Sequence, residues 1–431
     1  MTQKTNSQRF ESYLPDQTPP LGRLLMYAIQ QVIVMFPATI TVALITKFPV
    51  STTIFASGLA TVVFTILTKG KLPMYYGSSF AYLSAVLSLA CAELGCTAEE
   101  LPIVLPVEVI GKAQFGIVLS GFVSIFAGLL VRKLGNEILQ KFLPPVVTGS
   151  VAAAIGLSLA SNAVSDFGIK TQNWSYILVA VVTLVTVVLS TRYLKGFIGQ
   201  LSLLIGTLAG CLVAAVLHFT GIDTNLFRAI ADEAVKGLAT FGPLTVPLFN
   251  LPIPNTAALS IIPIALATIP ESSAHTIQLD AIIKNATGEE TGIKDMLDKD
   301  LIGDGICDMV SGFVGGPAGT NYGENISVMA ITKVFSTKVM VVAGIMAMII
   351  SFFKPLIGVI YGIPLAVIGG LEVYLFGAIA VQGIMMLKDV NWGAKEIAIA
   401  SIVLIVGMVD IGLAAILGLT LSFVLSFGSK D

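Results

Sequence analysis

Charged residues are scarce in this chain. They make up 12% of its 431 residues, whereas soluble domains carry about 25%. Hydrophobic residues make up 55%, and the mean hydropathy is +0.91. Long apolar runs in so uncharged a chain indicate a polytopic helical protein embedded in a lipid bilayer. The runs are continuous rather than alternating, which excludes a transmembrane β-barrel.

Several functional signatures are also missing. The four cysteines have no metal-ligand spacing: Cys91 and Cys96 either pair in an outside loop or, like Cys211 and Cys307, fill apolar space. There is no basic cluster suited to nucleic acid. There is also no nucleophile motif or phosphate-binding loop, so we expect no enzyme activity, no cofactor and no metal. The first twenty residues lack the apolar core of a signal peptide, so the first span is expected to be retained.

The apolar pattern predicts an all-α protein of fourteen membrane segments, seven in each half. The first seven lie at 22–46, 50–68, 78–91, 113–131, 142–162, 174–191 and 198–217. After a polar stretch at 219–255, the second seven lie at 257–283, 300–315, 324–334, 338–354, 358–386, 393–408 and 411–428. Because seven is odd, the second set enters the membrane in the opposite sense. The pattern therefore predicts two inverted repeats.

Two of these segments, 78–91 and 324–334, are too short to span the membrane as full helices. Each is third in its half and follows a glycine-containing turn, at 76–79 and at 315–319. Interrupted segments at matching places in two halves predict a transporter whose binding site lies at the breaks.

The distribution of Lys and Arg predicts the orientation. With the N-terminus inside, the predicted cytoplasmic loops receive roughly three times as many basic residues as the other side. Both termini are then cytoplasmic, and the acidic loop at 93–100 lies outside.

Glu271 and His275 lie inside the apolar run from 257 to 283. An ionisable residue at membrane depth is costly and is by default functional. The two are four residues apart, so on a helix they share one face, and Pro270 is expected to kink that helix beside them. They suggest a proton-handling pair. The alternatives are a hydrogen bond that only joins helices, or a place in a water-facing loop.

The two short segments offer free backbone N–H groups at their N-termini, at Ser79-Phe80 and Gly323-Glu324. Gly323 allows close approach of a ligand to the backbone. Ionised Glu271 and Glu324 accept hydrogen bonds, whereas the backbone groups donate them. A planar imide, with alternating N–H and C=O, needs that mixture. The pattern defines hydrogen bonding and not a particular molecule.

The motifs at these places resemble those of the nucleobase–ascorbate transporter family, and of its bacterial uracil permeases in particular. They are KGKLP at 69–73, YGSSFAY at 76–82, ESSAH at 271–275, NYGEN at 321–325 and MAITK at 329–333. The similarity runs from about residue 21 to the C-terminus. It implies a secondary active transporter that imports a nucleobase by proton symport and alternating access, in the cell inner (plasma) membrane.

The resemblance also implies a domain division. Residues 21–135 and 256–355 would form a core domain (segments 1–4 and 8–11), and residues 136–218 and 356–431 a gate domain (segments 5–7 and 12–14). A cytoplasmic tail at 1–20 and an inter-repeat loop at 219–255 complete the chain. Short antiparallel strands would precede the half-helices of segments 3 and 10, and some members of the family form homodimers through their gate domains.

The resemblance assigns roles to the residues that match its motifs. Glu271 and Glu324 would hold the base, with His275 tuning the protonation of Glu271. The other expected site residues are Ser79, Phe80 and Gly323 at the breaks, Tyr322 and Ala38 on the pocket wall, and Gln31 and Asn325 in support. The chain departs from the family at Ser327, where the signature has Gly, and at Gln31, where uracil permeases usually have His. Glu372 is an additional carboxylate, expected at a pocket rim or in an interhelical hydrogen bond.

Uracil is the expected substrate, because purine-transporting relatives often have Gln at the position of Glu324, and Gln can donate as well as accept. Xanthine, uric acid or another purine is the alternative within the family. An anion transporter of the same architecture is less compatible with two carboxylates at the site. A membrane-embedded enzyme using Glu271, His275 and Glu324 as acid–base groups is the remaining alternative.

Overall fold

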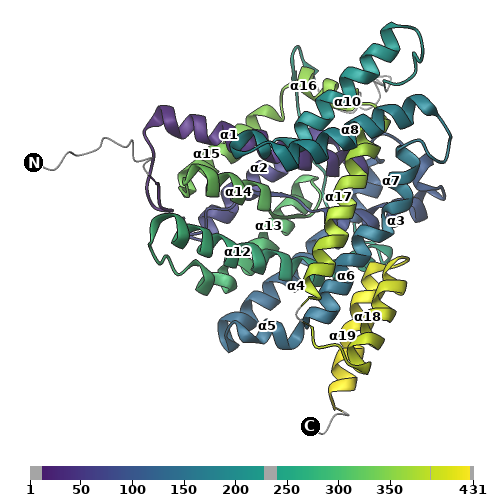
Figure 1. The fold of residues 1–431 in the computed structure, drawn as a ribbon. Helices are drawn as coiled ribbons and strands as arrows, with labels where there is room; N and C mark the ends of the chain where they lie inside the picture. The colour runs from purple at the N-terminus through teal and green to yellow at the C-terminus, as the bar shows by residue number, and fades with distance from the viewer. Residues whose placement is uncertain (1–11, 228–239, 389, 428–431) are drawn as a thin grey trace, which may run out of the picture.

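The computed structural model describes residues 12–227, 240–388 and 390–427, and it is mostly helical (Figure 1). The helices of the first half are α1 Leu21–Thr46, α2 Val50–Leu67, α3 Leu83–Leu94, α4 Val107–Leu134, α5 Glu137–Phe142, α6 Pro145–Ser158, α7 Ala160–Asp166, α8 Trp174–Tyr193, α9 Gly196–Gly199 and α10 Ser202–Phe219. Those of the second half are α12 Ala265–Thr287, α13 Leu297–Val314, α14 Gly323–Thr332, α15 Thr337–Ile350, α16 Lys354–Tyr361, α17 Leu365–Met386, α18 Ala394–Gly407 and α19 Ile411–Phe427. Short 3₁₀ turns are η1 Phe80–Tyr82, η2 Ala98–Glu100, η3 Ala257–Ile264 and η4 Ile293–Met296.

Parts of the predicted tails and of the 219–255 loop lie outside the described residues, as do five of the basic residues used for the orientation: Lys4, Arg9, Arg228, Lys236 and Lys430. The described end of the N-terminal tail is not free. The Tyr13 amide donates to the Lys333 carbonyl, and the Phe335 and Thr337 amides donate to the carbonyls of Tyr13 and Pro15. This stretch therefore packs against the connection between α14 and α15.

Eight helices among the described residues are long and apolar enough to cross a membrane, at 21–46, 50–67, 107–134, 145–166, 174–193, 202–219, 257–287 and 365–386. Shorter apolar helices lie at 80–94, 337–350 and 411–425. The chain is thus a multi-pass membrane protein, as predicted. The number fourteen remains a prediction. The predicted ninth segment, α13, differs from the others because it carries four aspartates, Asp298, Asp300, Asp304 and Asp308.

Two predicted segments are each divided into separate helices. Segment 142–162 comprises the end of α5, then α6 and α7, and segment 358–386 comprises the end of α16 and all of α17. Prolines stand at the breaks: Pro144 and Pro145 open α6, and Pro364 precedes α17. Proline lacks the N–H that a helix interior needs and has the backbone angle of a first turn, so a new helix begins there.

Two short strands pair with each other among the helices, and we call this pair the strand crossing. Strand β1, Tyr76–Ser78, pairs antiparallel with β4, Gly319–Asn321, so that Tyr76 lies opposite Asn321 and Ser78 opposite Gly319. The predicted strands before the two half-helices are therefore present. A second small hairpin joins β2 Thr240–Phe241 to β3 Leu244–Thr245.

The outer edges of this central pair are bound by side chains, because backbone groups at membrane depth need partners inside the protein. On the β1 side, the Tyr76 carbonyl accepts hydrogen bonds from Ser57 at 2.9 Å and Thr61 at 3.2 Å, both on α2. On the β4 side, the Gly319 amide donates to Asp308 Oδ1 on α13 at 2.7 Å. Helices α2 and α13 thus hold the crossing from opposite edges.

The helices pack in matching pairs across the two halves. Helix α2 packs against α15 and α4 against α13, α8 against α10 and α18 against α19, and α6 against α17. These contacts are symmetric between the two sets of seven predicted segments. When each segment is replaced by its counterpart in the other set, the α2–α15 contact becomes the α13–α4 contact and the α8–α10 contact becomes the α18–α19 contact. The α6–α17 contact maps onto itself. In Figure 1, α1, α2, α12, α14 and α15 gather on the left, and α17, α18 and α19 lie to the right of them.

Two of these matching pairs are joined by glycines. A Cβ on Gly58 of α2 would lie 2.3 Å from the Gly344 carbonyl oxygen of α15, and one on Gly121 of α4 would lie 2.5 Å from that of Gly305 in α13. Small residues allow helix backbones in a membrane to approach this closely. Only glycine fits at these contacts, which bring α13 and α15 against the first half of the chain.

Candidate functional site

The two half-helices begin where the central strands end. The Ser79 amide donates to the Ala318 carbonyl at 2.9 Å, and the Tyr322 amide donates to the Tyr75 carbonyl at 3.0 Å. Phe80 then begins η1, which continues into α3, and Gly323 begins α14. The N–H groups of residues that begin a helix have no partner within it, so both breaks offer donors to a ligand. Ser79 contributes in another way, because its hydroxyl accepts the Ala81 amide at 3.3 Å and caps η1.

Glu271 and His275 lie on α12, which remains helical through Pro270 and so keeps the two side chains on one face. The Nε2 atom of His275 lies 3.0 Å from the position that a Cβ on Gly323 would occupy. The carboxylates of Glu271 and Glu324 are close enough to interact electrostatically. Fold and sequence thus bring the two acids and the imidazole together at the start of α14, and all three are half-buried.

Tyr322 joins three elements at this site. Its hydroxyl donates to the Ser78 carbonyl at 3.0 Å and shares a 3.1 Å hydrogen bond with Thr39 on α1. Its ring covers Gly77, where an added Cβ would lie 2.1 Å from a ring carbon. Any residue larger than glycine at 77 would push Tyr322 away, so Gly77 is needed for the strand crossing. Ala38, the neighbour of Thr39, is buried on the same helix.

The two supporting residues contact each other. Asn325 Nδ2 donates to the Gln31 carbonyl at 3.0 Å and to Gln31 Oε1 at 2.7 Å, which fastens α14 to α1. Ser327, where the family signature has Gly, donates its hydroxyl to the Gly323 carbonyl at 3.0 Å. The serine is therefore accommodated by a bond within its own helix.

A row of buried aspartates on α13 is the feature of this region that sequence reasoning missed. Asp300, Asp304 and Asp308 follow one another by four residues, so on a helix they share one face, and all are buried. Asp308 Oδ1 accepts from the Tyr76 hydroxyl at 2.9 Å. Asp304 Oδ2 accepts from Ser272 at 2.7 Å. The spacing of three acids in a predicted membrane segment was the signal that could have revealed them.

The row is adjacent to the predicted site residues. Ser272 follows Glu271 on α12, and Asp304 is close enough to interact electrostatically with Glu271. The last residue of β4, Asn321, donates its side-chain amide to Asp300 Oδ1 at 2.9 Å and directly precedes Tyr322. The second half of the chain therefore surrounds β4 with acidic groups on two helices.

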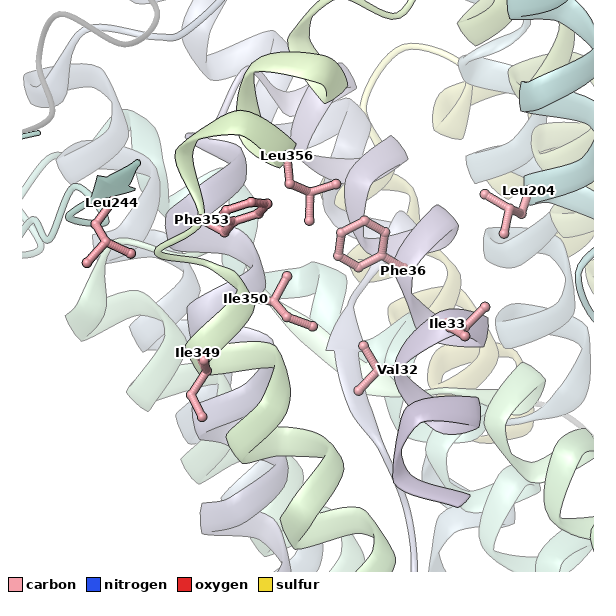
Figure 2. A pocket seen from close by; sticks show the side chains of 9 residues that line it. All are labelled: Val32, Ile33, Phe36, Leu204, Leu244, Ile349, Ile350, Phe353 and Leu356. Carbon is pink, nitrogen blue, oxygen red and sulfur yellow. The ribbon is translucent and has the colours of Figure 1, made fainter. Parts of the chain in front are cut away.

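Two cavities lie elsewhere. The cavity in Figure 2, about 500 Å³, lies among α1, α15 and α16, with Phe36, Ile350, Phe353 and Leu356 pointing toward one another. Its lining side chains are all apolar and cannot position a polar ligand by hydrogen bonds. A second cavity of about 700 Å³ is lined by both apolar and polar residues, and Glu372 on α17 is one of the charged ones, which agrees with the expected pocket position of that carboxylate.

All four cysteines are free thiols, so the alternative of a Cys91–Cys96 disulfide is wrong. Cys307, on α13, is buried and donates to the Ala60 carbonyl at 3.3 Å. It therefore fills space between α13 and α2, as expected of a small apolar residue.

Comparison with known proteins gives consistent matches over most of the chain. Residues 22–416 match the Permease family (Xan_ur_permease). The uracil permease of Escherichia coli (strain K12) is 32% identical over 424 residues, 96% of this chain and 91% of that protein. The uracil permease of Bacillus caldolyticus is 31% identical over 399 residues, 90% of this chain and 86% of that protein.

Among solved structures, the transmembrane domain of the cyanobacterial bicarbonate transporter BicA has a similar fold. The TM-score is 0.63, with 16% sequence identity over 91% of this chain and 96% of that one. At this identity the likeness concerns the fold alone. The sequence relatives are named permeases, which are transporters and not enzymes.

Proposed function

The chain belongs to the Permease family (Xan_ur_permease), and from that premise we propose that it is a secondary active transporter that imports uracil together with a proton. Its uracil permease relatives support a nucleobase substrate. The observation that carries the proposal is the meeting of Glu271, Glu324 and two helix N-termini at the strand crossing. Uracil has alternating N–H and C=O groups, and this site offers acceptors and donors side by side.

In the proposed complex, Glu271 and Glu324 accept the N–H groups of uracil, and the amides of Phe80 and Gly323 donate to its carbonyl oxygens. Tyr322 and Ala38 form the wall, and Ser79, Gln31 and Asn325 hold the surrounding backbone. Glu271 carries the proton, and His275 one turn away adjusts how readily it does so. Substrate that prefers one protonation state of Glu271 must shift the proton equilibrium, by reciprocity.

We further propose that the fourteen segments cross the membrane as two inverted repeats, with a core domain (segments 1–4 and 8–11) and a gate domain (segments 5–7 and 12–14) that move against each other. The matching helix pairs and the antiparallel strands support this arrangement. Both termini lie in the cytoplasm, the protein resides in the inner membrane, and gate domains provide the surface for a homodimer.

The second candidate function is anion transport, which the fold likeness to a bicarbonate transporter favours. Two carboxylates at the site disfavour it, because they repel an anion. The experiment is uptake of labelled uracil into proteoliposomes with and without an inward proton gradient, in competition with unlabelled thymine, xanthine, uric acid, bicarbonate and sulfate. Uptake driven by the gradient and inhibited by pyrimidines is expected. Bicarbonate or sulfate uptake that uracil leaves unchanged would overturn the proposal.

A further inference from the structure

Asp300 and Asn321 share one hydrogen bond in the protein interior. Asp300 lies on α13 and Asn321 ends β4, and both residues have 0% of their surface exposed. Asn321 Nδ2 donates to Asp300 Oδ1 at 2.9 Å. The remaining oxygen of each side chain, Asp300 Oδ2 and Asn321 Oδ1, is buried without a hydrogen-bond partner in the part of the chain that the structure describes. The Thr276 hydroxyl on α12 is a donor available to Asp300, whereas Asn321 Oδ1 has no donor among the described residues.

An ionised Asp300 leaves Asn321 Oδ1 without a donor, because a carboxylate oxygen and an amide oxygen both only accept. A buried charge without a counter-ion is also strongly unfavourable. The ion pair nearest in sequence joins Arg132 of α4 to Asp298 at 2.8 Å, and no ion pair among the described residues includes Asp300. One proton on Asp300 Oδ2 removes both difficulties. It neutralises the carboxylate, and it donates to Asn321 Oδ1 to close a ring of two hydrogen bonds between an acid and an amide.

We propose that Asp300 and Asn321 form a proton-binding site separate from Glu271, in which Asp300 carries the proton and Asn321 accepts its hydrogen bond. Titratable groups lie near the pair on several elements: Asp304 and Cys307 on α13, His275 on α12, and Tyr76 opposite Asn321 in β1. None of these is a permanent cation that would stabilise an ionised Asp300. Burial and the absence of a cation among these neighbours therefore favour the protonated acid.

The site connects to substrate through the backbone. Asn321 is followed by Tyr322, Gly323 and Glu324, so a proton on Asp300 holds the end of β4 from which the substrate-binding segment begins. Loss of this proton places an unpaired charge next to Asn321 and loosens that end. This link rests on the proposed function: proton binding at Asp300 and uracil binding at Glu324 then favour each other.

The first test is infrared spectroscopy of the purified full-length protein at neutral pH. Asp300→Asn retains a donor for Asn321 Oδ1 and an acceptor for Asn321 Nδ2, but it has no proton to lose. The difference spectrum from wild type is expected to show the loss of one protonated carboxylic-acid band. Asp298→Asn is the control, and it should remove an ionised carboxylate band because Asp298 pairs with Arg132. Loss of an ionised band in Asp300→Asn would overturn the proposal.

A second variant covers the case in which Asp300→Asn fails to fold. Asn321→Ala leaves the acid in place but removes its partner, so the carboxylic-acid band should move to higher frequency as its hydrogen bonds are lost. A band unchanged in position would overturn the pairing.

The third measurement is uracil affinity against pH. Wild-type uracil affinity is expected to fall about tenfold from neutral to alkaline pH, and that of Asp300→Asn by less, because only the proton on Glu271 is then lost. Equal declines would overturn the link between this proton and substrate. If wild type binds no uracil at any pH, the proposed function fails, and the infrared bands alone then decide the proton site.

Discussion

The two strands that cross at the centre of the molecule have the same shape but different surroundings. The outer edge of β1 is held by the hydroxyls of Ser57 and Thr61 on α2. The outer edge of β4 is held by carboxylates on α13, with Asp308 at one end and Asp300 at the other. The half-helix after β1 offers a backbone amide, whereas the one after β4 begins with Gly323 and Glu324. The first half of the chain therefore contributes mainly a correctly placed backbone donor, whereas the second half contributes side chains that can bind protons.

This comparison predicts two classes of variant. Changes on the β1 side should damage folding or the position of a backbone donor, with little effect on proton dependence. Changes on the β4 side should alter binding and proton dependence in a fold that survives.

The largest expected effect is on the folding of the strand pair, in which Gly77 of β1 packs against the Tyr322 ring. Gly77→Val places a Cβ within 2.1 Å of the Tyr322 ring, so the strand crossing cannot form as it does in wild type. We expect a loss of about 3 kcal/mol in unfolding free energy, measured by thermal or denaturant unfolding in detergent. Gly377→Ala is the control, because nothing lies within 4 Å of a Cβ there. Equal stability of both variants would contradict the described contact.

The next effect concerns the backbone donor after β1. Phe80→Pro deletes the N–H proposed to bind substrate, and uracil affinity should fall by at least about tenfold. Ser79→Ala removes only the η1 cap, so it should lower stability by about 1 kcal/mol and leave affinity nearly unchanged. A folded Ser79→Ala that binds less uracil than Phe80→Pro would exclude the backbone role.

On the β4 side, Glu324→Gln keeps the size of the side chain but replaces one acceptor oxygen with a donor. A substrate N–H would then meet an N–H, which costs about 1–3 kcal/mol. Uracil binding should weaken about tenfold in isothermal titration. The exposed Glu289→Gln serves as control. Binding equal to wild type in Glu324→Gln would remove Glu324 from the site.

The smallest effect compares one hydroxyl from each side. Ser272 donates to the carboxyl group of Asp304 at 2.7 Å, and Ser57 donates to the neutral Tyr76 carbonyl at 2.9 Å. Hydrogen bonds to charged groups are worth about 1.5–3 kcal/mol and neutral ones about 1 kcal/mol. Ser272→Ala should therefore cost about 1 kcal/mol while Asp304 is protonated and more at alkaline pH, where Asp304 is ionised, whereas Ser57→Ala should cost about the same at every pH. If the two variants lose the same stability at every pH, the outer edges of β1 and β4 do not differ in charge.

The sequence predicted the residues that contrast with their surroundings. Glu271, His275 and Glu324 stand out because ionisable groups are rare in apolar runs, and the structure brings them together. The half-helices were also predictable, because the glycine turns before them break two apolar segments. The same criterion applies to Asp300, Asp304 and Asp308, whose spacing by four residues within the predicted segment 300–315 places them on one helix face.

Other features depend on contacts between distant parts of the chain. The pairing of Tyr76 with Asn321 joins residues more than two hundred positions apart, and no local pattern specifies it. The need for glycine at position 77 arises only when the Tyr322 ring covers it. The hydrogen bond from Asn325 to Gln31 likewise requires α14 to lie against α1. Such partners follow from tertiary packing rather than from residue type or spacing.

The measurement that tests the account most directly is uracil-driven pH change inside proteoliposomes. Adding uracil outside wild-type vesicles should acidify the interior, because each substrate enters with a proton. Glu271→Gln should abolish the acidification and retain uracil exchange, since exchange does not require an empty carrier to return. His275→Ala should still move protons, with a shifted pH optimum. Full acidification by uracil in Glu271→Gln would contradict the assignment of the coupling proton to Glu271.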